Sequence, residues 1–211
     1  MTENVEGHVI FMTDPICSWC WGMLPELFIL QEEFGHRLNF DLRCAGLQLG
    51  SKRPLREDQA KDLIALWHRV AETTGQQFAF SLPADATFIY HSELACRALH
   101  IARRYLQEEP WQLFQSIQEA FYVHCRNIND LGQLFKLVKD CGIDEQTFRN
   151  EMTSETIIAS TRNEFDWCNS QGIQALPTLF LDLGTGPKLI SGGFATAEYL
   201  VPEIKSRLVT H

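Results

Sequence analysis

Cys17 and Cys20 form a pair whose residue type and spacing suit redox chemistry. They follow a short apolar run that predicts a strand over 8–12, and they open a run with apolar residues at helical spacing. At the start of a helix, unpaired backbone N–H groups and the helix dipole stabilise a thiolate. A second cysteine three residues later lies on the same face and can close a disulfide. We therefore predict that Cys17 attacks, that Cys20 resolves, and that the pair alternates between dithiol and disulfide.

The same C-x-x-C spacing also suits tetrahedral zinc coordination by thiolates. A structural zinc needs two further ligands, and the sequence has no second C-x-x-C and no histidine pair at zinc-finger spacing. The dipeptide of His124 and Cys125 is the remaining candidate. Because C-x-x-C beside a β-α unit is typical of redox sites, we predict a redox site and no metal.

The segments that must position these cysteines contain predicted strands near both ends of the chain and only predicted helices between them. A strand over 8–12, a helix over 19–34 that Pro25 should kink, and an alternating strand over 38–44 predict a β-α-β unit. Strands return over 178–183 and 189–191, followed by a helix over 196–208. Between them lie apolar stripes at helical spacing over 57–74, 92–106, 111–125, 130–141, 144–152 and 156–170. We expect a domain in two halves, residues 1–45 and 173–211, with a helical domain inserted over 46–172.

Composition limits the partners and the compartment. A net charge of -9 disfavours nucleic acid or an anionic membrane as the main partner, since those surfaces attract Lys and Arg. Residues 1–7 carry no Lys or Arg, and the apolar run after them is shorter than a signal-peptide core or a membrane span. We therefore expect a cytoplasmic protein. The five other cysteines are scattered singly, unlike a secreted disulfide framework, and most should be buried thiols.

Four segments together resemble the DsbA-like branch of the thioredoxin superfamily, especially its cytoplasmic FrnE-type proteins. The segments are the active-site run 14–20, the helix 90–100, the loop 175–179 and the closing run 190–193. The resemblance spans the whole chain and implies an α/β thioredoxin fold with a large all-helical insertion. It also implies that the bond between Leu176 and Pro177 is cis and that Pro177 faces the cysteines.

Several positions depart from the better-understood relatives. Thioredoxin and DsbA carry a buried acid six residues before the first cysteine, where this chain has Phe11. Asp14 is the candidate replacement as a proton relay, with helix capping as the alternative role. Leu176 has no hydroxyl, so a substrate would pair with its backbone. Trp19 and Trp21 are candidates for an apolar platform that binds substrate beside the sulfurs, with packing in the first helix as the alternative.

The resemblance implies a thiol-disulfide oxidoreductase that acts on protein or small-molecule disulfides. It implies no bound cofactor, with glutathione as a candidate co-substrate. Because the cytosolic thiol pool keeps dithiols reduced, reduction or isomerisation is expected rather than net oxidation. Two alternatives stay open. One is a glutathione-dependent isomerase or transferase of the kappa-class or hydroxychromene-carboxylate isomerase type, which usually has Ser at the position of Cys17. The other is a non-catalytic redox-sensing module.

Overall fold

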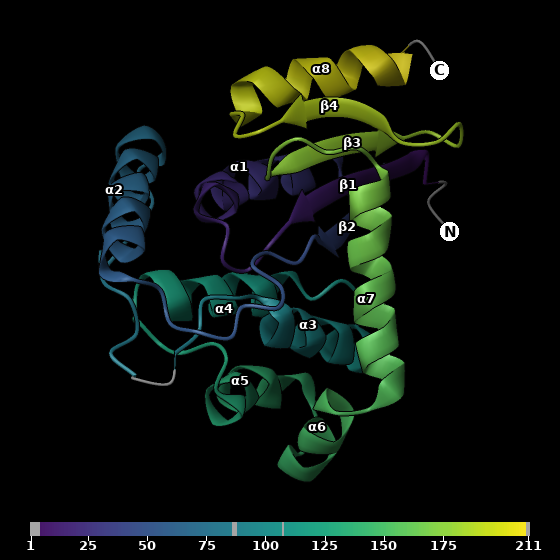
Figure 1. The fold of residues 1–211 in the computed structure, drawn as a ribbon. Helices are drawn as coiled ribbons and strands as arrows, with labels where there is room; N and C mark the ends of the chain where they lie inside the picture. The colour runs from purple at the N-terminus through teal and green to yellow at the C-terminus, as the bar shows by residue number, and fades with distance from the viewer. Residues whose placement is uncertain (1–4, 86–87, 107, 210–211) are drawn as a thin grey trace.

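A four-stranded mixed sheet forms the centre of the computed structural model, which describes residues 5–85, 88–106 and 108–209 (Figure 1). Residues 1–4, part of the N-terminal segment without Lys or Arg, lie outside the described residues. The strand order is β2-β1-β3-β4, with β1 parallel to β2 and antiparallel to β3, and β3 antiparallel to β4. The strands are β1 (Gly7–Thr13), β2 (Leu38–Cys44), β3 (Thr178–Asp182) and β4 (Lys188–Gly192). The predicted β-α-β and β-β-α units are therefore present, and the predicted thioredoxin fold is confirmed.

Helices cover both faces of this sheet, because strand β1 carries apolar side chains on each face. Val9 and Phe11 belong to the core that includes α1 (Ser18–Phe34) and α8 (Ala197–Val209). Ile10 and Met12 point the other way and pack with Cys168 of α7 (Glu155–Ser170). Figure 1 shows α7 in front of β1 and β2, with α1 behind them. The sheet is thus buried on two sides, and the end of β1 lies between α1 and the helical part.

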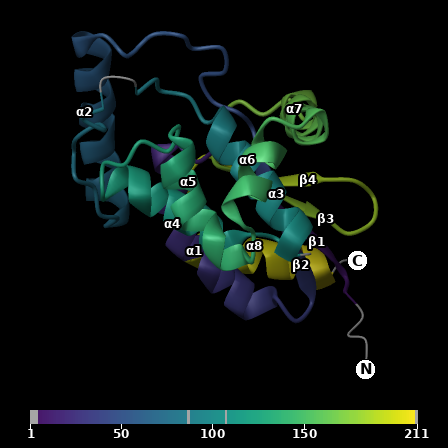
Figure 2. The same ribbon diagram turned by 90° about the horizontal axis from the view of Figure 1, so that it is seen from below.

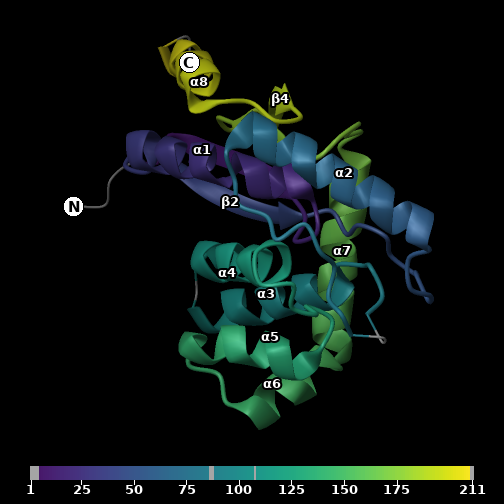
Figure 3. The same ribbon diagram turned by 90° about the vertical axis from the view of Figure 1, so that its left-hand side faces the viewer.

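Helices α3 to α6 of the helical part lie beyond the β2 side of the sheet, as Figures 2 and 3 show, whereas α2 packs against α1. The elements of the helical part are α2 (Glu57–Thr74), α3 (Glu93–Leu106), α4 (Trp111–Tyr122), α5 (Leu131–Val138), the 3-10 turn η1 (Lys139–Cys141) and α6 (Glu145–Met152). The side chains of Asp130, Asp144 and Ser154 cap α5, α6 and α7. The predicted helix over 111–125 stops at Tyr122, because Cys125 has a positive φ of 49°. Within the described residues, no helix is long and apolar enough to cross a membrane.

A buried carboxylate in α7 connects the two parts of the chain. Glu164 Oε1 accepts a hydrogen bond from the backbone N–H of Cys44 at 2.9 Å, at the end of β2. Its other oxygen lies 3.3 Å from Arg103 Nη1 of α3. Because α7 contacts both the sheet and the helical part, it fixes one to the other. We retain the domain division at residues 46 and 172 as a proposal, with α7 shared by both.

Candidate active site

Cys17 is the N-cap residue of α1, at the turn where the chain leaves β1. Its backbone is extended, with φ -85° and ψ 109°. Its N–H donates to the carbonyl of Asp14 at 3.0 Å, which closes the turn. Its sulfur accepts a hydrogen bond from the N–H of Cys20 at 3.3 Å. A cysteine thus takes the capping place that Ser or Asp usually fills, and the predicted position at the helix start is confirmed.

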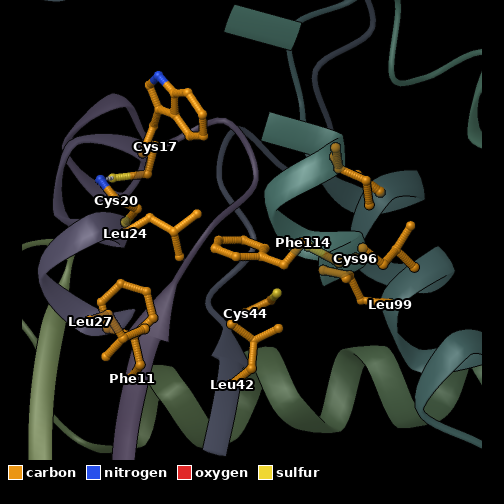
Figure 4. Close-up of a cluster of buried hydrophobic side chains, with 14 of the residues drawn as sticks. Phe11, Cys17, Cys20, Leu24, Leu27, Leu42, Cys44, Cys96, Leu99 and Phe114 are labelled. Carbon is orange, nitrogen blue, oxygen red and sulfur yellow. Dashed lines mark hydrogen bonds between the residues drawn. The ribbon is translucent and has the colours of Figure 1, made fainter. Parts of the chain in front are cut away.

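Cys20 lies in the first turn of α1, next to Cys17 (Figure 4). Cys20 is fully buried, whereas Cys17 has 8% of its surface exposed, and both are free thiols. Burial raises the pKa of the Cys20 thiol well above its ordinary value, and the hydrogen-bonded sulfur of Cys17 raises it further. The side chain of Thr13 and the backbone N–H of Asp14 act in the opposite direction. Cys20 therefore stays protonated in the dithiol, and Cys17 is the more exposed of the two residues.

The loop before β3 lies at the same end of the sheet as the cysteines. The peptide bond between Leu176 and Pro177 is cis, as predicted. The strand register places Thr178 opposite Met12, so Pro177 lies next to the end of β1 that leads into Cys17. The carbonyl of Pro177 accepts a hydrogen bond from Gly193 N–H at 2.7 Å, which connects the loop to the end of β4.

An aromatic pair borders the cysteine turn. The rings of Trp19 and Phe194 lie 5.9 Å apart, and both side chains, like that of Leu176, are only partly buried. Trp21 instead is buried, stacks on Tyr122 at 6.3 Å and packs in the core. Sequence patterns give no signal for Phe194, because it reaches Trp19 only through the return of β4 to this end of the sheet.

Asp14 is fully buried, and three hydrogen bonds hold its carboxylate. Oδ1 accepts from Ile16 N–H at 2.9 Å, and Oδ2 accepts from Leu47 N–H at 2.8 Å and from Ser92 Oγ at 2.7 Å. Burial raises its pKa to about 6, although these hydrogen bonds lower it. The carboxylate thus fastens the cysteine turn to the chain before α3. Its predicted part in proton transfer stays a prediction.

Residues from the helical part also support the cysteine turn, and local sequence patterns did not reveal them. Tyr90 Oη donates to the carbonyl of Ile16 at 2.9 Å, directly before Cys17. Burial raises the pKa of the Tyr90 phenol far above its ordinary value, so it stays a donor. With Ser92, which donates to Asp14, it makes the segment before α3 part of the site's framework.

No group of three or more potential metal ligands occurs among the described residues. The alternative zinc candidates are instead engaged elsewhere. His124 lies 3.5 Å from Glu119, and the Cys125 sulfur donates to the carbonyl of Ser81 at 3.2 Å. Nothing in this arrangement provides the two extra ligands that a zinc at Cys17 and Cys20 would need.

Comparison with known proteins relates this geometry to disulfide chemistry. The family model described as Thioredoxin matches residues 10–183. The structure of a candidate protein disulfide isomerase from Nitrosomonas europaea is 30% identical, with a TM-score of 0.89 over 98% of this chain and 99% of that chain. The cytosolic disulfide reductase DsbM from Pseudomonas aeruginosa is 20% identical, with a TM-score of 0.74 over 97% and 100% of the two chains. DsbM has also been solved with GSH.

Curated relatives match a shorter share of their own length. The ClpXP adapter protein SpxH of Bacillus subtilis is 22% identical over 177 residues, which cover 82% of this chain and 57% of SpxH. The chain therefore spans about half the length of the curated relatives it matches. The resemblance is confirmed at the level of the thioredoxin superfamily, and structures of DsbA proteins share the fold, whereas the FrnE-type branch stays a prediction.

Proposed function

This chain belongs to the thioredoxin family, and we propose that it is a cytoplasmic enzyme that reduces or isomerises disulfides through Cys17 and Cys20. Its enzyme class is thiol-disulfide oxidoreductase. The observation that carries the proposal is the asymmetry of the pair. Cys17 caps the helix and keeps 8% of its surface exposed, while Cys20 is fully buried and its pKa is raised. One sulfur is placed to meet a substrate and the other to release it.

The chemistry then runs in two exchanges. The thiolate of Cys17 attacks a substrate disulfide, forms a mixed disulfide and releases one substrate thiolate. Cys20 loses its proton and attacks the Cys17 sulfur, so that the Cys17–Cys20 disulfide forms and the second substrate thiolate leaves. Two electrons have passed from the dithiol to the substrate. Two glutathione molecules would restore the dithiol and leave as glutathione disulfide.

The substrate would bind on the partly exposed apolar surface of Trp19, Phe194 and Leu176. Trp19 lies in the cysteine turn with Phe194 against it, and Leu176 precedes the cis proline, so the three side chains would offer an apolar platform to a peptide that carries a disulfide. The backbone of Leu176 lies beside Pro177, which has no N–H, and it would pair with an extended substrate segment. We therefore propose substrate-binding roles for Trp19 and Leu176, with Phe194 added from the structure.

The same comparison supports glutathione and the cytoplasm as parts of the proposal. DsbM is a cytosolic disulfide reductase whose structure has been solved with GSH, and it shares this fold. We propose glutathione as the co-substrate that recharges Cys17 and Cys20. Under cytosolic thiol conditions the resting form would be the dithiol, so net reduction or isomerisation is favoured over oxidation. The glutathione-dependent isomerases of this fold usually have Ser in place of Cys17, and the retained cysteine pair favours exchange chemistry over theirs.

Turnover of a peptide disulfide in the presence of glutathione tests the proposal. Wild type should turn over, and Cys17→Ser should not. Cys20→Ser should attack once and accumulate as a mixed disulfide that mass spectrometry detects, because no resolving thiol remains. Cys141→Ser, a matched change at a partly buried thiol of η1, should behave as wild type. Activity in Cys17→Ser would refute the assignment of the nucleophile. A wild type that is alkylated at Cys17 yet never turns over would support the redox-sensing module instead.

A further inference from the structure

Thr13 is the last residue of β1, and it lies on the face that α1 covers. Side chains alternate along a strand, so Thr13 follows Val9 and Phe11 on one face, while Ile10 and Met12 occupy the other. Figure 4 shows Phe11 reaching from β1 towards α1, the helix that carries Cys20. Thr13 is therefore one step closer than Phe11 to the first turn of that helix.

The Thr13 hydroxyl is a buried polar group at this position. Oγ1 is fully buried and has no hydrogen-bond partner among the residues that the structure describes. Buried hydroxyls are normally paired, because leaving one unpaired costs free energy. The Thr13 side chain faces the sulfur of Cys20, which is a titratable group. A thiol sulfur accepts hydrogen bonds weakly, whereas a thiolate accepts them strongly. The hydroxyl thus faces an atom that becomes a good acceptor only when Cys20 loses its proton.

We propose that the Thr13 hydroxyl donates a hydrogen bond to the Cys20 thiolate whenever the Cys17–Cys20 disulfide forms or opens. The inference rests on the proposed function and deepens it. When Cys20 resolves a mixed disulfide, its proton goes to solvent, its thiolate bonds to the Cys17 sulfur, and the substrate leaves as a thiolate. In the reverse direction a thiolate attacks Cys17, and Cys20 leaves as the thiolate. The same donor stabilises Cys20 in both directions.

Two other nearby side chains do not act as the hydrogen-bond donor to the Cys20 thiolate. Phe11 has no polar atom, although it stands where relatives carry an acid. The Asp14 carboxylate is bonded to Ile16, Leu47 and Ser92, and only its backbone N–H faces the Cys20 sulfur. Threonine does not ionise near neutral pH, so Thr13 stabilises the thiolate without carrying its proton away.

The test follows the two exchanges separately by stopped flow. Reduced protein is mixed with one equivalent of an aromatic disulfide whose released thiol absorbs visible light. The first release reports attack by Cys17, and the second reports resolution by Cys20. The background carries Cys125→Ser and Cys141→Ser, because these two thiols are partly exposed. Thr13→Val should leave the first release unchanged and slow the second by about tenfold, whereas Thr13→Ser should resolve like wild type.

Resolution at the wild-type rate in Thr13→Val, or equal slowing in Thr13→Val and Thr13→Ser, would overturn the proposal. Thr13→Ala also lacks the hydroxyl and replaces Thr13→Val if that variant does not fold. A second readout is the thiolate absorbance of Cys20 in Cys17→Ser. Its titration midpoint should rise by about one pH unit when Thr13→Val is added, and an unchanged midpoint would contradict the donor role. Release of a single thiol by the wild-type site would instead refute the resolving role of Cys20, and with it the proposed function.

Discussion

Replacing Asp14 with Asn should remove a pH dependence of stability that this buried carboxylate creates. Burial raises its pKa from 3.8 to about 6, against the effect of hydrogen bonds from Ile16, Ser92 and Leu47. The folded state therefore binds this proton more tightly than the unfolded state does. The contribution to stability is fully present below pH 3.8, falls as pH rises towards about 6, and is constant above that value.

The magnitude follows from the two pKa values. A difference of about 2.2 units, at about 1.36 kcal/mol per unit, amounts to about 3 kcal/mol in the free energy of unfolding. Of this, about 2.4 kcal/mol should be lost between about pH 4 and about pH 7. Urea unfolding of wild type and Asp14→Asn under reducing conditions measures it. Subtracting the two free energies of unfolding at each pH removes the contributions of carboxylates that titrate in both proteins, including Glu109 and Glu164.

The Asp14→Asn change itself adds an offset, because the new amide cannot accept every hydrogen bond that the carboxylate accepts. That offset does not change with pH, so the slope of the difference carries the information. A difference between the two proteins that is equal at about pH 4 and about pH 7 would refute a titrating buried carboxylate. The same samples test the proton relay: a relay requires slower resolution by Cys20 in Asp14→Asn, and an unchanged rate would leave Asp14 a structural role only.

Three further outcomes are expected. Limited alkylation with peptide mapping should modify Cys17 before Cys20, because Cys17 keeps some exposed surface and burial keeps Cys20 protonated; earlier labelling of Cys20 would reverse their roles. Trp19→Ala should lower kcat/KM for a peptide disulfide by about tenfold while sparing a small aromatic disulfide, and exposed Tyr199→Ala is the control; equal effects of the two changes would remove the platform. Glu164→Gln should lower the free energy of unfolding by about 2 kcal/mol, because Arg103 loses one of its two carboxylate partners and keeps Glu109, whereas exposed Asp166→Asn on the same helix should be neutral; a neutral Glu164→Gln would refute the coupling through α7.

Local periodicity was sufficient for most of the fold. The predicted strand over 38–44 and helix over 57–74 have the same bounds as β2 and α2, because each carries a complete pattern of its own period. Cys17 could be placed at the start of α1 for the same reason: an apolar strand and a helical stripe meet at that residue. The cis bond before Pro177 came from the resemblance, since most loop prolines are trans.

Contacts between distant segments could not be predicted in this way. The hydrogen bond from Ser92 to Asp14 spans 78 residues, and neither residue carries a local signal for the other. The helix over 156–170 has an amphipathic stripe like its neighbours, so nothing local showed that α7 would cover the sheet. The contact of Thr13 could not be predicted either, because the strand pattern gives the face on which Thr13 lies but not the sulfur opposite it.

Pro25 shows how a local sequence feature is completed by the helical part. Proline has no N–H, so the carbonyl of Trp21, four residues earlier in α1, lacks its helical partner. Gln76 Nε2 donates to that carbonyl at 2.9 Å, and Trp21 Nε1 donates to the carbonyl of Gln77 at 3.0 Å. The segment after α2 therefore holds α1 one residue beyond Cys20. The sequence predicts the missing hydrogen bond, but only the tertiary fold supplies its replacement, so the helical part helps to fix the helix that carries both cysteines.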